Sequence, residues 1–460
     1  MKRHHWAKTG LAAVLIGTLL TGCASGTTVS TTTTGESCVD HACTTTATEP
    51  ATTTSKPILI QTVPKTTVVT APTTVVDVSP VIQSTDLMKN IKEKSAAEKE
   101  VDETFFNAYL NFSLNFFKEA NKTNNENVLV SPLSVQLLMG MLANGDNGQT
   151  QKEIETALGL PTSQINAYFR NYVGGLPSAE KHKVSVANAI WFNDHLSGTI
   201  KRDFLQTNAN YYDASLYQGD FDEQTRKEMN AWVEENTDGL LKDAIDTLSP
   251  QDLMVLINTV LFDGEWQKPY GKDHVYTTTF TTASGQERTV KMMAEVENVR
   301  AINMEDAVGF SKPFKDGYYS FVAVLPDASV PLDSYVSTLT VEKLKTMLNC
   351  ESMKARIGIP KFSVNYEADM NRILPSMGIT SLFSSGLNNI SSSKLSVDEI
   401  IHKTAIEVDE AGTKAAAVTA VKLKYASGFS VVLNRPFVYM IVDNTTNLPI
   451  FVGTVTDIGT

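Results

Sequence analysis

Several features that define common protein classes are scarce in this sequence. It contains four cysteines among 460 residues, too few for a disulfide-stabilised scaffold. Lys and Arg number 39 against 51 Asp and Glu, and the net charge of −12 argues against nucleic-acid binding, which requires clustered cations. No internal repeat is present. What remains is a globular protein, and a hydrophobic share of 42% is enough for a substantial core.

Motifs of catalytic and cofactor sites are also missing from the sequence. None of the seven histidines lies in a His-Glu-x-x-His zinc motif, and there is no Gly-x-Ser-x-Gly nucleophile elbow. Gly-rich dinucleotide and phosphate loops are absent as well. Acidic residues are numerous, but their spacing singles out no carboxylate pair. We therefore expect that the protein is not an enzyme and that it holds no metal or cofactor.

The N-terminus has the composition of an export signal. Lys2 and Arg3 form a basic start, and the apolar stretch Leu11–Leu20 is too short to span a bilayer in the mature protein. The stretch runs into Cys23, and Leu20–Cys23 resembles a bacterial lipobox. That resemblance implies a signal peptide over residues 1–22, cleavage before Cys23 and a lipid such as palmitate on the new N-terminal cysteine; a plain signal peptide is the alternative. We expect a secreted lipoprotein of the cell envelope that faces outside the cytoplasm.

Residues 23–94 are expected to form a flexible, lipid-anchored tether. From Ala24 to about Thr85, Thr, Ser, Val and Pro dominate, so the segment cannot bury enough apolar surface to offset the entropy lost on ordering. Cys38 and Cys43 lie in this segment, and a disulfide between them and two free thiols are both open. Cys350 is alone in the rest of the chain and fits a small core position.

Residues 95–460 carry the patterns of one folded domain, beginning with two helices. Apolar residues between Phe105 and Phe117 recur every three to four positions, which predicts an amphipathic helix. Ser131 suits an N-cap and Pro132 the first position of a second helix, which continues to Ala143. Because this second helix is apolar almost all round, we expect it to be buried.

Strand patterns are interspersed with the helices and follow no repeated strand–helix unit. Val184–Trp191 and Met254–Phe262 are two such strands, the second interrupted by Asn258. A buried Asn needs a hydrogen-bond partner, since an unsatisfied polar group costs about 1–3 kcal/mol. Irregular mixing of helices and strands predicts the α+β class.

The most distinctive stretch runs from His402 to Phe437. It begins as a strand, continues through small residues and then alternates apolar and charged side chains from Val421 to Tyr425. Read in steps of two, one face holds Thr413, Ala415, Ala417, Thr419, Val421, Leu423 and Tyr425. The other holds Lys414, Ala416, Val418, Ala420, Lys422 and Lys424, and it carries the charges. This is the side-chain code of a half-buried strand. We interpret the stretch as a loop in one state and a strand in another.

Within that stretch, Glu410–Ala417 resembles the hinge of the reactive-centre loop in inhibitory serpins: an acidic residue, then Gly, Thr or Ser, and small residues. Further serpin-like motifs follow the family's order, at Asn127–Ser134, Gly145–Glu153, Phe262–Trp266, Val290–Met293, Phe321–Pro326, Ile359–Phe362 and Asn434–Phe437. Each is weak alone, and together they are specific.

The resemblance implies a serpin fold, with three β-sheets, about nine helices and an exposed reactive-centre loop. It implies suicide-substrate inhibition of serine proteases, with cysteine proteases as a further class. The protease cuts the loop and is held in a covalent complex while the loop inserts into the main sheet, a well-known case of strand addition. The protein is then expected to be a monomer whose partners are its target protease and, through its lipid, a membrane.

The same resemblance assigns site residues. The hinge consists of Glu410, Gly412, Thr413, Ala415, Ala416 and Ala417. A buried polar cluster beneath the opening strands consists of Ser131, Ser134, Asn258 and His402, and Trp266 lies near the top of the sheet, where insertion starts.

Two counts place the scissile bond differently. Fourteen residues beyond Gly412, a spacing common among inhibitory serpins, lies Ala426, which gives the bond Ala426–Ser427. Nine residues before Asn434 lies Tyr425. We prefer the hinge count because sheet geometry sets the length of an inserted strand. Alanine suits elastase- or subtilisin-like pockets, tyrosine suits chymotrypsin-like ones, and Lys424 or Lys422 would suit trypsin-like ones, so the target stays open.

Two other classes of function compete with the inhibitor. A non-inhibitory serpin that binds a ligand or partner would favour bulky, charged or Pro residues in the hinge, where only Lys414 is charged. A lipid-anchored binding protein of a transporter would show repeated strand–helix units, which the sequence lacks.

Overall fold

The computed structural model describes residues 83–122, 126–179, 182–384, 386–413 and 428–459. All of them belong to one compact unit, residues 79–460. The helices of the described residues are α1 Glu103–Ala120, α2 Pro132–Ala143, α3 Gln149–Leu158, α4 Thr162–Gly175, α5 Arg202–Tyr211, α6 Glu223–Asn236, α7 Leu332–Thr338, α8 Val341–Leu348 and α9 Met370–Ser376. Among these helices, none has the length and apolar composition needed to cross a membrane.

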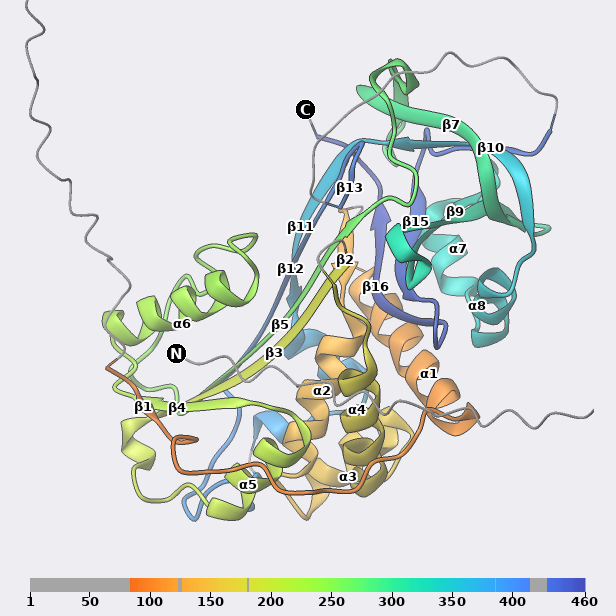
Figure 1. Ribbon diagram of the computed structural model, residues 1–460. Coiled ribbons are helices and arrows are strands. Elements are labelled where there is room, and N and C mark those ends of the chain that lie inside the picture. Colours follow the sequence, from red (N-terminus) through yellow and green to blue (C-terminus); the bar gives the residue numbers. More distant parts are fainter. Residues whose placement is uncertain (1–82, 123–125, 180–181, 385, 414–427, 460) are drawn as a thin grey trace, which may run out of the picture. The chain divides into compact units, whose positions relative to one another are not determined.

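Sheet A, the seven-stranded sheet, contains the first described part of the stretch that the sequence singles out, up to Thr413 (Figure 1). Its order is β1 Thr85–Asp86, β4 Ser215–Gly219, β3 His182–Asn193, β5 Met254–Glu265, β12 Glu399–Val408 and β11 Phe362–Asp369. A seventh, short strand, β13 Gly412–Thr413, pairs with β5. The predicted strands at Val184–Trp191 and Met254–Phe262 are therefore present, as parts of β3 and β5.

Sheet B, the nine-stranded sheet, has the order β14 Ser430–Val432, β10 Ser352–Pro360, β7 Glu287–Asn303, β8 Ala307–Pro313, β9 Tyr319–Pro326, β15 Phe437–Asp443, β16 Leu448–Val455 and β2 Val128–Val130, with β6 Val275–Thr281 paired to β7. Two of the three expected sheets are joined here by the long strand β7. Its first part pairs with β6 and β10, and its end, Arg300–Asn303, pairs with β8. The expected α+β architecture is present, and hydrogen bonds through β7 make two of its sheets continuous.

Helix α2 forms as its sequence predicts. The Ser131 hydroxyl accepts the backbone N–H of Ser134 at 3.3 Å, and Pro132 occupies the first turn, where its missing N–H has no intrahelical partner to lose. Every residue of the helix is buried. The helix contacts β5 of sheet A and β16 of sheet B, so no side of it faces solvent and its apolar sequence is satisfied.

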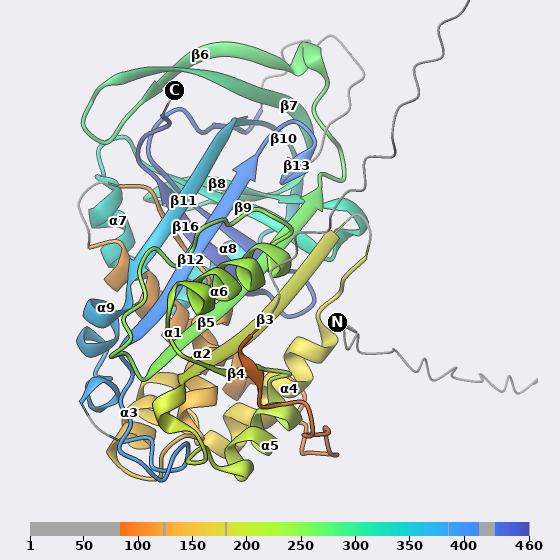
Figure 2. The same cartoon turned by 90° about the vertical axis from the view of Figure 1, so that its left-hand side faces the viewer.

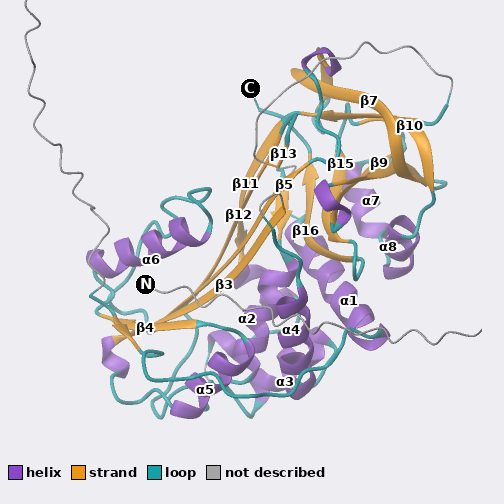
Figure 3. Ribbon diagram, viewed as in Figure 1, coloured by secondary structure: helices purple, strands orange, loops and turns teal. Residues whose placement is uncertain are grey.

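Sheet A is covered on both faces, as Figure 3 shows with helices on either side of its strands. Side chains of β5 alternate between the faces: Leu256 and Phe262 join the main core, whereas Val255 and Ile257 join a second cluster with Met229 of α6. Figure 2 shows α6 lying across the strands of the sheet. Alternation along β5 therefore assigns even-numbered residues to the α2 side and odd-numbered residues to the α6 side.

The folded part begins before residue 95, the boundary expected from composition. Thr85 and Asp86 add to the edge of β4, and Glu228 of α6 accepts the backbone N–H groups of Gln83 at 2.6 Å and Ser84 at 3.1 Å. Residues 83–94, assigned to the tether from the sequence, thus contact the domain. Composition does not predict these contacts. The edge of β4 and the buried Glu228 carboxylate bind the backbone of this polar segment, and backbone groups are the same in every sequence.

Candidate functional site

The hinge lies where β5 and β12 end. At one end these parallel strands are joined by a ladder that pairs Glu399–Ile401 with Val255–Ile257. At the opposite end the chain leaves β12 at Val408, turns, and returns as β13, which pairs antiparallel with the last residues of β5. The direction of β13 is that of a strand entering between β5 and β12 from the top.

Glycine is required at position 412 by a close approach of two backbones. Gly412 has φ = 156°, and a Cβ built on it would overlap the carbonyl oxygen of Gly264 and lie 2.8 Å from the Glu265 Cα. Any larger residue would push β13 away from β5. The glycine of the hinge motif therefore has a physical reason in this chain.

Thr413 faces the interior from β13. Its side chain is 2% exposed, and its hydroxyl accepts the backbone N–H of Gly264 at 3.0 Å. Thr413 stands opposite Gly264, an even-numbered residue of β5, and thus on the α2 side of the sheet. A small side chain is needed here because the space above Gly264 is shared with Phe262 and Phe314.

Trp266 and Tyr270 form a platform on which the hinge docks. The backbone N–H of Trp266 donates to the Ala411 carbonyl at 2.7 Å, its indole N–H to the Asp409 carbonyl at 2.9 Å, and the Tyr270 N–H to the Glu410 carbonyl at 2.8 Å. The Trp266 side chain is fully buried. Three consecutive carbonyls of the chain between β12 and β13 are therefore held by one segment.

Glu410 adds an ion pair to the same junction. Its carboxylate lies 2.8 Å from the ammonium of Lys361, the residue between β10 and β11. Burial raises the pKa of Glu410, but the hydrogen bond from Lys361, a backbone hydrogen bond and the charge of Lys361 together outweigh it, so the pKa lies below its usual value. The Glu410 carboxylate is thus charged, and its ion pair joins the hinge to the residue that precedes β11, the strand paired with β12.

The buried polar cluster lies nearer to the ladder between β5 and β12 than the hinge does. It consists of Ser131, Ser134, Asn258 and His402. Asn258 and His402 directly follow Ile257 and Ile401, the last pair of the ladder between β5 and β12. All four residues are at most 4% exposed. The cluster therefore lies at the point where the joined part of the two strands stops.

Hydrogen bonds run through this cluster in one direction. The Ser131 N–H donates to His402 Nε2 at 3.2 Å, which assigns the proton of a neutral imidazole to Nδ1, 3.5 Å from the Ser134 hydroxyl. Ser134 in turn donates to the Asn258 carbonyl oxygen, and the Asn258 amide donates to Asn188 on β3. The chain of donors links β12, α2, β5 and β3.

His402 is held neutral by this arrangement. Burial lowers its pKa to about 4. A protonated imidazole would also turn Nε2 into a donor that faces the N–H of Ser131. Because both effects disfavour the charged ring, its protonation opposes the folded state.

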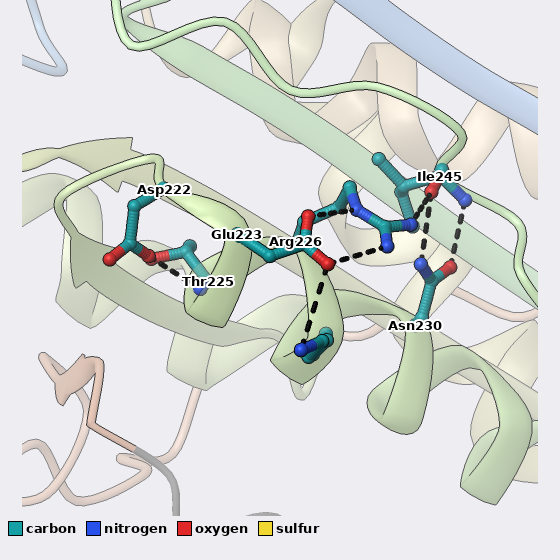
Figure 4. Close-up of polar contacts among 7 residues, drawn as sticks. Asp222, Glu223, Thr225, Arg226, Asn230 and Ile245 are labelled. Atoms are coloured by element: carbon teal, nitrogen blue, oxygen red, sulfur yellow. Dashed lines mark hydrogen bonds and ion pairs between the residues drawn. The ribbon is translucent and has the colours of Figure 1, made fainter.

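The α6 side of sheet A is closed by a helix and the segment that follows it. Figure 4 shows Arg226 and Asn230 of α6 directed at the main chain of Ile245. Asn230 exchanges two hydrogen bonds with Ile245, at 2.8 and 2.9 Å, and Arg226 donates to the same carbonyl at 2.9 Å. Any strand that enters between β5 and β12 must pass beneath this cover.

Some predicted site residues lie outside the described residues: Cys23, Cys38, Cys43, Ala415, Ala416, Ala417, Tyr425, Ala426 and Ser427. Sequence reasoning also missed residues that the structure adds. Asn188 could have been found in the same way as Asn258, because it is also a polar residue within an apolar strand. Lys361 had no signal, because its partnership with Glu410 joins distant parts of the chain. Within the described ranges, no group of three or more His, Cys, Asp or Glu could hold a metal ion.

Comparisons with known proteins agree with this geometry. A family model described as "Serpin (serine protease inhibitor)" matches residues 107–458. Neuroserpin of Homo sapiens is 28% identical over 375 residues, which cover 76% of this chain and 90% of neuroserpin. A serpin-like protein of Methanosarcina acetivorans is 28% identical over 353 residues, or 73% of this chain and 82% of that protein.

Solved structures show the same relationship. The thermophilic serpin tengpin in its native state is 38% identical with a TM-score of 0.77, covering 82% of this chain and 100% of that chain. Tengpin in its latent state gives a lower TM-score of 0.70, with 79% of this chain covered and 100% of that chain. The chain therefore belongs to the serpin family, its fold is the serpin fold, and the recognition made from the motifs is confirmed. Members of this family are generally protease inhibitors rather than catalysts.

We predict that His402 makes stability depend on pH. Its pKa is lowered from 6.5 to about 4 in the folded state, so the stabilisation is complete above pH 6.5 and is lost as pH falls toward 4. A shift of this size corresponds to about 3 kcal/mol of unfolding free energy. Urea unfolding of the protein and of His402→Gln between pH 4 and 8 measures it. The free energy of unfolding should change less with pH in His402→Gln than in the unaltered protein. An equal pH dependence of the two proteins would contradict the role given to His402.

Proposed function

We propose that the protein is a suicide-substrate inhibitor of serine proteases, and also of cysteine proteases, tethered to the cell envelope. The protease cuts the loop beyond β13, and the part of the loop that remains attached to β13 enters sheet A between β5 and β12 while the protease is covalently attached. The observation that carries the proposal is the pairing of β13 with the end of β5, in the direction an inserting strand requires.

The register of β13 supports the alternation read from the sequence. Gly412 pairs with Glu265 and Thr413 with Gly264. Continued along β5, that register pairs Ala415 with Phe262, Ala417 with Val260, Thr419 with Asn258, Val421 with Leu256 and Leu423 with Met254. All of these β5 residues are even-numbered and face the α2 side. The small and apolar face of the loop would thus enter the core, while Lys414 would stand opposite Asp263 on the other face.

The same register gives the polar cluster a role in insertion. The parallel register of β5 and β12 places Asn258 level with His402. An inserting strand would bring the Thr419 hydroxyl to that level, between the two residues. A hydroxyl can both donate and accept there, so it can join a buried network without leaving a polar group unsatisfied. Insertion would break hydrogen bonds within the cluster. An apolar residue at position 419 could not replace them, and polar groups of the cluster would be left without a partner.

Strand length limits where the protease can cut. In the continued register Leu423 reaches Met254, the first residue of β5. A cut before residue 423 would leave an inserted strand shorter than its neighbour. Both bonds considered from the sequence, Ala426–Ser427 and the one after Tyr425, satisfy this limit.

The main experiment is incubation of the purified protein with elastase, subtilisin, chymotrypsin, trypsin and papain. With a target protease, we expect a covalent adduct that survives boiling in detergent, together with a released peptide that begins near Ser427. The physical reason is that the loop inserts while its cut end is still bonded to the protease, before normal hydrolysis is complete. If every protease cuts the loop and stays active, the protein is a substrate and the inhibitor proposal fails.

The hinge is tested by two neighbouring substitutions. Thr413 is only 2% exposed in β13, so Thr413→Arg should displace β13 from β5, and insertion must then bury an unpaired cation, which costs several kcal/mol. Because each 1.4 kcal/mol changes a rate about tenfold, insertion should slow by roughly a hundredfold or more. The loop should then be cut at the same bond, without an adduct.

Lys414→Arg is the matched control, one residue further on and on the opposite face. It should inhibit as well as the unaltered protein. The gain in thermal stability after loop cleavage gives a second readout, since insertion completes the sheet: it should be large in Lys414→Arg and small in Thr413→Arg. Equal inhibition by the two variants would show that the alternating faces do not govern insertion.

The envelope tether rests on Cys23 and is tested separately. Cys23→Ala removes the thiol that would carry the lipid, so the processed protein should appear in the soluble fraction instead of the membrane fraction. Fractionation followed by immunoblotting measures this. A processed Cys23→Ala protein that stays in the membrane would count against lipid attachment at this residue.

A further inference from the structure

Five ionisable side chains meet beneath the hinge platform. Lys312 of β8 lies between the two carboxylate oxygens of Glu297, at 2.7 and 2.9 Å. Next to this pair, Glu295 binds Lys268 and lies 3.1 Å from His274 Nδ1. Lys312 is 1% exposed, and the Glu297 side chain is 8% exposed. Four of the five side chains are buried and only Lys268, at 53% exposure, reaches the surface.

Stability alone gives little reason for such a pair. Removing two charges from water is costly, and replacing a buried ion pair with apolar residues is often neutral or stabilising. Burial lowers the pKa of Lys312, and Glu297 counteracts this. A cation kept here at such cost calls for a role other than stability.

The contacts of Lys312 converge on the platform that holds the hinge. Its ammonium lies 5.3 Å from the ring centroid of Trp266 and 4.7 Å from that of Tyr270, and it donates to the Lys268 carbonyl at 3.1 Å. Trp266 and Tyr270 are the two residues whose N–H groups hold the carbonyls of Asp409, Glu410 and Ala411. One buried cation therefore touches the segment at its first, middle and last residue.

Other contacts keep this segment in place without Lys312. The Gln267 N–H donates to the Pro313 carbonyl at 3.1 Å, and Trp266 stacks on Phe314 with centroids 4.6 Å apart. Loss of the cation should consequently leave the segment folded. What it removes is the attraction of the ammonium for the two rings.

We propose that Lys312 is a positioning residue for the hinge: it aligns Trp266 and Tyr270 so that Asp409–Ala411 stays docked and β13 stays paired with β5. Because β13 is the start of the strand that would insert, this alignment sets the fraction of cleaved loops that insert before the protease escapes. The second statement rests on the proposed inhibitory function; the first does not.

The test is the double variant Lys312→Met/Glu297→Met, which removes the cation and its partner together and leaves no buried charge unpaired. The readout is hydrogen exchange, followed in peptides that cover Trp266–Tyr270 and Asp409–Thr413, with Tyr319–Pro326 in β9 as internal reference. We expect exchange about tenfold faster in the first two and unchanged in β9, because only local opening is affected. Unchanged exchange at the platform, or equal acceleration in β9, would overturn the positioning role.

Two control variants separate position from charge. Lys343→Met/Asp306→Asn removes another lysine–carboxylate pair, 2.6 Å apart, whose lysine lies over the Tyr335 ring at 5.4 Å, and it should leave the hinge peptides unchanged. Lys312→Arg keeps a cation beside Glu297 and near both rings, because a guanidinium stays charged when buried. If Lys312→Arg accelerates hinge exchange as much as the double variant, the cation is not the cause and the proposal fails.

Protease assays with the same variants decide the functional half. The double variant should be cut at the unaltered rate but should give several-fold more cleaved protein per adduct. Faster hinge exchange with an unchanged ratio would overturn the link to insertion and leave the positioning role standing. If the unaltered protein forms no adduct with any protease, the inhibitory function fails, and the exchange measurement still decides whether Lys312 positions the hinge.

Discussion

The structure depends on a ladder between β5 and β12 that joins the two strands over three residue pairs, although the strands are 12 and 10 residues long. Beyond Ile257 and Ile401 the strands continue toward the hinge, and β13 adds to β5 at the far end. A strand begun at one end of a sheet can be extended by further backbone pairing, because each non-Pro residue carries one N–H and one C=O group. The helix α2 beneath, the cover formed by α6 and the hinge platform are all arranged around this one opening.

The two ends of the opening are controlled by different physics. At the lower end, neutral groups form a directed network through His402, Ser134 and Asn258, in which each donor has one acceptor. At the upper end, charges and aromatic rings hold the chain: Lys361 pairs with Glu410, and Lys312 lies under Trp266. Neutral hydrogen bonds can be exchanged for those of an incoming hydroxyl at little net cost, whereas a buried ion pair resists rearrangement. The lower end is therefore suited to the separation of β5 from β12 during insertion, and the upper end to holding the hinge in position.

Much of the site was accessible from the sequence, for identifiable reasons. Ser131 and Pro132 start α2 through local cap chemistry, which needs no distant contact. Asn258 stood out because a polar residue within an apolar run must find a partner, and Ser134 is that partner. The domain begins earlier than composition predicts, because Glu228 binds the backbone of residues 83 and 84. The sequence could not predict this contact, because a backbone group has no sequence signature.

The sequence by itself determined the family, the order of the elements and the alternation of faces from Thr413 onward, because periodicity and motifs are properties of neighbouring residues. Only the tertiary structure decided which residues meet across the chain. It brought Lys312 of β8 beneath Trp266, set Lys361 against Glu410, joined two expected sheets through β7, and placed Gly412 against Gly264 with no room for a side chain. Such contacts join residues far apart in the sequence, and their distances are set by how sheets and helices pack rather than by any local pattern.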